Sequence, residues 1–221
     1  MSKEVVFCDF DGTITERDGF VAVCRHFAPE AVSRWLPGVL DGSISLRKGL
    51  TEMLESIPSC HHDAMMAHCD AIAIRPGFEA LLDYLAEREI PFVVISGGLK
   101  GLVERKLGPL VKKTAGIYAP ELDATGPKLK VVSAFPGERE LLAKVDVMKN
   151  YPCKTAIAIG DGITDYNMAQ RADRVFARHQ LADHMASRGL AYEPWEDFYD
   201  VLGCFKGENA KGAGSFLCPG K

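Results

Sequence analysis

The sequence predicts an α/β protein: a parallel sheet covered by helices on both faces, with a smaller helical unit inserted after the first strand. Apolar runs with the length of buried strands recur along the chain, and segments with helical spacing of apolar residues separate them. Between the first two strands this alternation stops, and only helical patterns follow one another. A length of 221 residues accommodates one such core and a small additional unit.

The expected strands are nearly continuous in apolar residues, which is typical of strands that are buried on both faces. They lie at residues 5–10, 92–96, 155–160 and 174–177. Three of the four end in Asp, Ser or Gly-Asp, so polar residues gather at the carboxyl ends of the strands. Open α/β sheets bind their ligands at this edge, and we expect the functional site there.

The inserted unit spans residues 18–75, and we expect it to be a helical-bundle cap over the core. The turn sequence Arg75-Pro76-Gly77 marks its end, so residues 1–17 and 76–205 are expected to form the core. Within the core, residues 116–135 carry turn chemistry between runs of β-formers and predict a hairpin. Residues 206–221 are rich in Gly and Lys and predict a flexible tail.

Composition and charge exclude several classes of protein. The formal net charge is -4 and no Lys/Arg-rich run occurs, so neither nucleic acid nor an anionic membrane surface is an expected partner. We see no signal-peptide pattern and no apolar stretch near the roughly 20 residues that span a bilayer. Seven scattered cysteines predict reduced thiols without a disulfide framework. We expect a cytoplasmic protein, monomeric or homodimeric, that acts on a small molecule.

Four separated pieces of sequence can meet at the carboxyl edge of the sheet. They are Asp9 with Asp11, the segment Ser96-Gly97-Gly98, Lys144, and the segment Gly160–Asp165, which contains Asp161. Four carboxylates at one edge would raise one another's pKa unless a cation lay among them. Oxygen ligands without a His or Cys cluster favour a hard ion, and we predict Mg²⁺.

A phosphorylated substrate would give each of these pieces a role. A carboxylate can attack phosphorus and form an aspartyl-phosphate, while Lys, Ser and glycine N–H groups neutralise the phosphoryl oxygens. A second carboxylate can shuttle the proton.

The stretches DFDGT, ISGG and GDGITD, with a lone Lys opening a helix, resemble the four motifs of the haloacid dehalogenase superfamily of phosphatases. The resemblance implies a Rossmann-like core in which Asp9 is the nucleophile and Asp11 the general acid and base. It implies that Lys144 pairs with the phosphate and with Asp9. Asp11 also favours a phosphatase over a dehalogenase, since expulsion of a halide needs no acid.

The same resemblance assigns the remaining candidates. Ser96 and Gly97 would hold phosphoryl oxygens, and Thr13 is placed with them as a phosphate-binding candidate. Asp161 would bind Mg²⁺ together with Asp9 and the main-chain carbonyl of Asp11. Asp165 would be a ligand through water or a partner of Lys144.

A helical insert between the first two motifs resembles the cap of the phosphoserine-phosphatase-like branch, which closes over small substrates and excludes water. The stretches DFDGTIT, GVLDGSISLRKGLTEM and FVVISGG are similar to phosphatases of methionine salvage, and this substrate class ranks first. Phosphoserine ranks second. Relative to phosphoserine phosphatases, Asp18 stands where a glutamate that binds the substrate amine would be expected. Arg47 falls near the place of an arginine that would bind the substrate carboxylate.

Several alternatives stay open. Lys149 competes with Lys144, which we favour because it can begin a helix. Asp18 and Arg47 fit equally well as a helix cap and a surface charge. The stretch CHHDAMMAHCD matches no standard zinc spacing and predicts a solvated cap helix. From other classes, a phospho-ligand binding protein without activity and a phosphotransferase remain as hypotheses.

Overall fold

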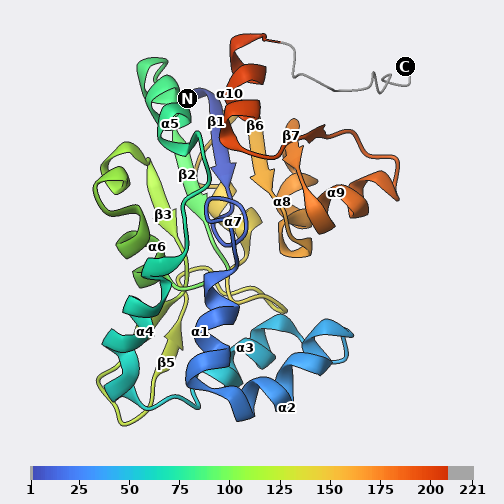
Figure 1. Ribbon diagram of the computed structural model, residues 1–221. Coiled ribbons are helices and arrows are strands. Elements are labelled where there is room, and N and C mark those ends of the chain that lie inside the picture. The colour runs from blue at the N-terminus through green and yellow to red at the C-terminus, as the bar shows by residue number, and fades with distance from the viewer. Residues whose placement is uncertain (1, 209–221) are drawn as a thin grey trace.

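Six parallel strands form the central sheet of the computed structural model, which describes residues 2–208 of the chain (Figure 1). Their order across the sheet is β3-β2-β1-β6-β7-β8. The bounds are β1 Ser2–Cys8, β2 Phe92–Ile95, β3 Gly116–Tyr118, β6 Cys153–Gly160, β7 Arg174–Ala177 and β8 Glu193–Pro194. The predicted fold class is confirmed, and the sequence patterns missed only the short edge strands β3 and β8 among the strands of this sheet.

Strand β1 lies in the middle of the sheet, hydrogen-bonded in parallel to β2 on one side and to β6 on the other. Its successive side chains enter opposite layers, as the alternation of a strand requires. Val6 and Cys8 pack into one hydrophobic cluster, and Val5 and Phe7 into a second. Burial of a large apolar side chain stabilises the fold by about 1.5–3 kcal/mol, so this uninterrupted apolar run holds β1 at the centre of the sheet.

Helices cover both faces of the sheet (Figure 1). The cluster that contains Val6 is built with α5, α6 and α10, and the cluster that contains Phe7 with α7, α8 and α9. The bounds are α5 Phe78–Glu87, α6 Lys100–Leu107, α7 Lys144–Met148, α8 Tyr166–Ala169, α9 His179–Ala186 and α10 Phe198–Lys206. Short 3-10 helices follow α6 at Gly108–Lys113 and precede α8 at Ile163–Asp165.

Four helices form the cap below the carboxyl ends of the central strands (Figure 1). They are α1 Gly19–Phe27, α2 Pro29–Leu40, α3 Leu46–Leu54 and α4 His62–His68, with 3-10 turns at Ser59–His61 and Cys69–Ala71. The cap helices build an apolar core that includes Phe20, Met53 and Met65, and Leu102 of α6 packs into it from the α/β core. At its base, the entering and leaving segments pair through an isolated bridge between Thr15 and Ile74.

The hairpin predicted within residues 116–135 consists of β4 Glu121–Asp123 and β5 Lys130–Val132, which pair antiparallel. Although it belongs to the core in sequence, it packs against the cap. Leu129 is fully buried in the apolar core of the cap, and its N–H donates to the carbonyl of Ile57 at 3.1 Å. The N–H of Val131 donates to Glu55 Oε1, also at 3.1 Å. The hairpin thus ties the cap to the core at a second point.

Other features of the described chain bear on the remaining sequence predictions. The cysteines whose side chains are described, Cys8, Cys24, Cys60, Cys153 and Cys204, are all free. Between residues 2 and 208 we find no helix with the length and apolar character to cross a membrane. Helix α10 includes Lys206 and is capped by Gly207 in the left-handed region, so the helix extends into the start of the predicted tail. The rest of that prediction, residues 209–221, lies outside the described residues.

Candidate active site

The loops that follow β1, β2 and β6 meet at one edge because these three strands are neighbours in the sheet. In Figure 1 the strands point toward the cap, so their carboxyl ends open into the space between core and cap. Asp9 still belongs to the end of the ladder, since its N–H donates to the carbonyl of Ile159 at 3.0 Å. The chain then turns sharply at Gly12, whose φ is +81°. Sheet topology therefore brings the separated sequence motifs together.

Lys144 lies between two buried aspartates. Its Nζ donates to Asp9 Oδ1 and, at 2.6 Å, to Asp165 Oδ1. The side chains of Lys144, Asp9 and Asp165 are 2%, 8% and 0% exposed. Lys149 instead pairs with Asp146 on the surface. The structure therefore places Lys144, and not its rival, beside Asp9.

Three carboxylates form an oxygen cluster around this lysine. One side-chain oxygen each of Asp9, Asp161 and Asp165 lie within 4.8 Å of one another. Asp165 is held firmly, because its Oδ2 accepts from the N–H groups of Asp161 and Gly162, both at 3.0 Å. One oxygen of Asp165 thus accepts from Lys144 and the other from backbone N–H groups, which is consistent with the predicted role as a partner of Lys144.

The charges in this cluster do not balance. Burial, together with the charge of Asp165, raises the pKa of Asp9 well above its usual value, and the same two causes raise the pKa of Asp161. Although burial opposes it, the carboxylates of Asp165 and Asp9 raise the pKa of Lys144 and keep it charged. One ammonium group among three carboxylates leaves an excess of negative charge. An oxygen-only donor set with this excess fits a hard divalent cation such as Mg²⁺.

Asp11 lies apart from the cluster, at the amino end of α1. Its Oδ1 accepts from the N–H groups of Gly19 at 3.0 Å and Phe20 at 3.3 Å, and its Oδ2 accepts from Ser96 Oγ at 3.2 Å. Burial and the nearby charge of Asp18 raise the pKa of Asp11 to about 7, and the hydrogen bonds oppose this rise. A carboxyl group with this pKa can both give and take a proton at neutral pH.

Two glycines are required by the close packing of these carboxylates. A Cβ atom at Gly98 would lie 2.4 Å from Asp11 Oδ2, and one at Gly12 would lie 2.6 Å from Asp161 Oδ2. Neither position has room for a side chain. The glycines of the DFDGT and ISGG stretches therefore let the backbone approach Asp11 and Asp161.

The structure gives Thr13 a different place from the one predicted. Its side chain is fully buried, and its Oγ1 donates to Asp161 Oδ1 at 2.9 Å. The hydroxyl is committed to orienting a carboxylate and does not line the cavity between core and cap. The hydroxyl of Thr13 thus contacts a candidate metal ligand, Asp161, outside the lining of the cavity.

The two substrate-binding candidates in the cap, Asp18 and Arg47, differ in whether they line the cavity between core and cap. Asp18 caps α1, accepting from the N–H of Val21 at 2.8 Å, and lines the cavity between core and cap. Desolvation in this cleft raises its pKa. Arg47 is exposed, its guanidinium donates to the carbonyl of Gly137 at 2.9 Å, and it does not line that cavity. The structure therefore does not bring Arg47 to the site, because the residue joins α3 to a core loop.

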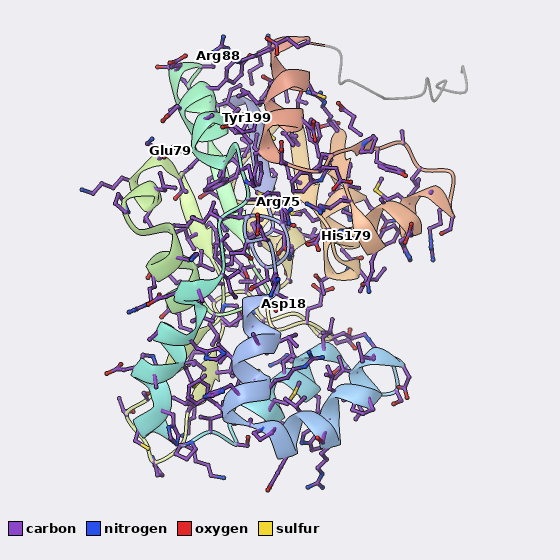
Figure 2. The ribbon with its side chains drawn as sticks, in the orientation of Figure 1. Asp18, Arg75, Glu79, Arg88, His179 and Tyr199 are labelled. Carbon is purple, nitrogen blue, oxygen red and sulfur yellow. The ribbon has the colours of Figure 1, made fainter. Side chains whose placement is uncertain are left out.

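Two residues near the site were not found from the sequence. The guanidinium of Arg75 donates to the carbonyls of Gly12 at 2.7 Å and Thr13 at 2.9 Å, which fixes the loop after β1. Arg75 lies on the core above Asp18, as Figure 2 shows. His179 begins α9 with a φ of +45°, and its Nδ1 lies 3.7 Å from Asp161 Oδ2. The only sequence signal at either position was the Arg-Pro-Gly turn.

A cavity of about 660 Å³ lies between core and cap. Asp9, Asp11 and Asp161 line it from the core, together with Gly97. Ser96 is fully buried behind them, and its Oγ accepts from the N–H of Gly98 at 2.9 Å. The cavity therefore gives a small molecule access to both candidate catalytic aspartates.

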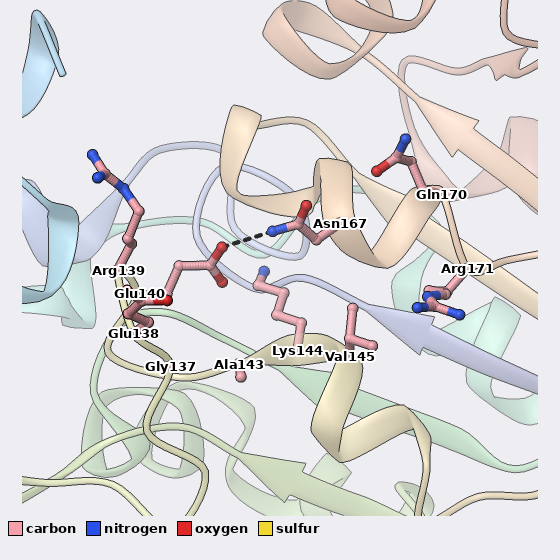
Figure 3. A pocket seen from close by; sticks show the side chains of 10 residues that line it. All are labelled: Gly137, Glu138, Arg139, Glu140, Ala143, Lys144, Val145, Asn167, Gln170 and Arg171. Atoms are coloured by element: carbon pink, nitrogen blue, oxygen red, sulfur yellow. Dashed lines mark hydrogen bonds between the residues drawn. The ribbon is translucent and has the colours of Figure 1, made fainter.

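A second cavity, of about 440 Å³, lies on the other side of Lys144 (Figure 3). Asn167 Nδ2 donates to Glu140 Oε1 across it at 2.9 Å. Burial raises the pKa of Glu140, and the charge of Lys144 opposes that rise. The loop that carries Glu140 thus forms the outer wall behind the lysine.

A carboxylate next to a buried lysine and a separate carboxyl group with a pKa raised to about 7 are parts that phosphoryl transfer needs. On this α/β scaffold they fit an enzyme that acts on phosphate esters. The chain belongs to the haloacid dehalogenase-like hydrolases, whose family model matches residues 6–170. The resemblance drawn from the sequence motifs is confirmed.

Known proteins similar to this chain agree with that family. A 2-hydroxy-3-keto-5-methylthiopentenyl-1-phosphate phosphatase of Microcystis aeruginosa (strain NIES-843 / IAM M-2473) is 41% identical over 203 residues, covering 91% of this chain and 96% of the relative. A solved phosphoserine phosphatase from T. onnurineus shares the fold at a TM-score of 0.70 and 19% identity, over 95% and 96% of the two chains. A structure described as a phospho-aspartyl intermediate analogue of phosphoserine phosphatase gives 0.67 and 19%, over 92% and 99%.

Proposed function

We propose that this protein is a Mg²⁺-dependent phosphatase that hydrolyses 2-hydroxy-3-keto-5-methylthiopentenyl-1-phosphate through a phosphoryl group carried by Asp9. The observation that carries the proposal is the separation of the two aspartates after β1. Asp9 lies in the cluster with Lys144, whereas Asp11 lies apart between Ser96 and the amino end of α1. This separation lets one carboxylate attack while the other manages the proton.

In the first step, a carboxylate oxygen of Asp9 forms a bond to phosphorus as the ester bond to the leaving oxygen breaks. Asp11 gives its proton to that oxygen, so the product leaves as an alcohol or enol. In the second step, Asp11 takes a proton from water, whose oxygen attacks phosphorus and breaks the bond to Asp9. Inorganic phosphate leaves and both aspartates return to their starting states.

Lys144 orients Asp9 and opposes the rise in its pKa, and its charge offsets that of the phosphoryl oxygens. The ligands we propose for Mg²⁺ are Asp9, Asp161 and the main-chain carbonyl of Asp11. Asp165 would be a ligand through water or the partner of Lys144. When bound, Mg²⁺ supplies positive charge that neutralises the phosphate and the crowded carboxylates. Thr13 and the loop fixed by Arg75 hold the ligands in place.

The relative that is 41% identical supports the choice of substrate, because the similarity extends over nearly the whole of both chains. Phosphoserine is the second candidate. The solved phosphoserine phosphatases that share the fold favour it only weakly at 19% identity. Arg47, the candidate for binding a substrate carboxylate, donates a hydrogen bond to the carbonyl of Gly137 and does not line the cavity. This position further disfavours phosphoserine as the substrate. We propose a cytoplasmic enzyme without a nucleic-acid or membrane partner, monomeric or homodimeric.

Phosphate release from purified protein with Mg²⁺ tests the function. We expect kcat/KM for the methylthiopentenyl phosphate to exceed that for phosphoserine by roughly 100-fold or more, since pocket contacts contribute about 1–3 kcal/mol each. The Asp9→Asn variant gives the background rate. Preference for phosphoserine would overturn the substrate, and no release from any phosphate ester would favour the binding-protein hypothesis. Transfer of phosphate to added alcohols in preference to water would favour a phosphotransferase.

A further inference from the structure

One wall of the cavity between core and cap is apolar. Its residues come from two cap helices, Leu36, Val39 and Leu40 from α2, and Leu46 and Leu50 from α3. Asp9, Asp11 and Asp161 line the same cavity from the core. A ligand with its phosphate at these aspartates therefore has an apolar surface within the same space.

The exposure of two large apolar residues adds independent support. Leu40 is 78% exposed and Ile163 is 47% exposed. Single exposed apolar residues are common on protein surfaces. These two, however, line one cavity, Leu40 from the cap and Ile163 from the loop after β6. Apolar side chains left uncovered on both sides of a single cavity are typical of a binding surface for an apolar group.

The distribution of charge limits what this wall can bind. Outside the aspartate site, the charged residues that line the cavity are Glu16, Arg17 and Asp18, from the loop before α1, and His179 lines it from the start of α9. No charged residue of α2 or α3 lines it within the described residues. A charged substrate tail against these helices would lose its hydration without gaining a partner.

We propose that Leu36, Val39, Leu40, Leu46 and Leu50, with Ile163 opposite, form a subsite for the apolar tail of the substrate and determine its specificity. The inference rests on the proposed function and deepens it, since it assigns residues to the recognition of the tail. It specifies the class of substrate as a phosphate ester whose distal end is apolar and uncharged.

Binding of n-alkylphosphonates, from methyl to hexyl, tests the subsite without turnover. With Mg²⁺ present, calorimetry on the wild-type protein should show Kd falling about fourfold for each added methylene, as expected for burial of an apolar group. Phosphonates of the same length that end in a carboxylate should bind at least roughly tenfold more weakly than their methyl-ended counterparts. A Kd that does not change with chain length, or tighter binding of the carboxylate series, would overturn the proposal.

Variants locate the effect. Leu40→Gln removes an exposed apolar side chain and should flatten the dependence of Kd on chain length, and Ile163→Gln tests the same subsite from the core side. Val132→Gln is the matched control, because Val132 is 54% exposed and does not line the cavity. Wild-type dependence in both Leu40→Gln and Ile163→Gln would refute the assignment. Since phosphonates are not hydrolysed, a protein that releases no phosphate but keeps the chain-length dependence would contradict the proposed function alone.

Discussion

Ser96 Oγ donates a hydrogen bond of 3.2 Å to Asp11 Oδ2, although the two residues are 85 positions apart in the sequence. Ser96 Oγ in turn accepts a hydrogen bond from the N–H of Gly98 at 2.9 Å. Asp11 is therefore held from one side by the loop after β2 and from the other by the amino end of α1. This arrangement fixes the direction in which Asp11 can pass a proton.

The activity should depend on the protonation of Asp11. Because its pKa is raised to about 7 and the protonated form serves as the acid, kcat/KM should fall as the pH rises through that value. Asp11→Asn should lose roughly 10²–10⁴-fold in kcat/KM on an alkyl phosphate, and much less in kcat/KM on para-nitrophenyl phosphate, because kcat/KM reports the first step and this leaving group needs no proton there. A pH–rate profile of both enzymes on both substrates measures this. Equal losses on the two substrates would contradict the role of Asp11 as the acid.

The same carboxyl group should make the stability of the protein depend on pH. Its folded pKa lies above the unfolded value of 3.8, so the folded state holds the proton more tightly. The contribution of Asp11 to stability is full below the unfolded pKa and is lost as the pH rises to about 7, with a slope of at most about 1.4 kcal/mol per pH unit. Urea unfolding with EDTA should therefore show Asp11→Asn gaining stability relative to wild type as the pH rises from about 4 to about 7, with little further change above that value. A constant difference would disprove the linkage.

Lys144 and Lys149 give a matched pair of variants. Lys144→Met leaves Asp9 and Asp165 buried without their cation, so we expect a loss of about 3–5 kcal/mol in the free energy of unfolding and of measurable turnover. Lys149→Met removes only a surface pair with Asp146 and should change stability by less than about 1 kcal/mol. Denaturant titrations and phosphate release distinguish the two. Similar effects of both substitutions would contradict the assignment of the phosphate lysine.

Thr13 should act on metal affinity. Its hydroxyl orients Asp161 through a 2.9 Å hydrogen bond, and loss of such a partner weakens metal binding by roughly 10–100-fold. Thr13→Val should therefore raise the Mg²⁺ concentration that gives half-maximal activity by that factor, while kcat at saturating Mg²⁺ changes little. Thr13→Ser keeps the hydroxyl and should behave like wild type. An unchanged Mg²⁺ requirement in Thr13→Val would contradict the proposal that Thr13 orients Asp161 for metal binding.

The sequence could predict those parts of the site that depend on chain direction and local chemistry. Uninterrupted apolar runs define central strands, and because parallel strands end at one edge, Asp9, Ser96 and Asp161 had to meet there. The expectation that Lys144 begins a helix distinguished it from Lys149, and α7 does begin at Lys144. The edge strands β3 and β8 were missed because two or three residues carry no periodicity.

Roles that depend on distant partners could not be predicted from the sequence. Arg75 binds main-chain carbonyls of the loop after β1, and carbonyls look alike at every position of a sequence. The hydroxyl of Thr13 meets a carboxylate 148 residues away, so its neighbours in the sequence gave no indication of that contact. By sequence position Arg47 belongs to the cap and strand β5 to the core. Arg47 nevertheless contacts a core loop and β5 contacts the cap, because tertiary packing decides such contacts.

The most direct test of the account is chemical trapping of a phosphoryl group on Asp9. Wild-type protein mixed with Mg²⁺ and substrate, quenched in acid within the first turnover and treated with borohydride, should contain homoserine at position 9 in a mass spectrum of its peptides. Asp9→Asn and wild type without substrate should show no such conversion. Conversion at another aspartate, or none during measurable turnover, would contradict the assignment of Asp9 as the nucleophile.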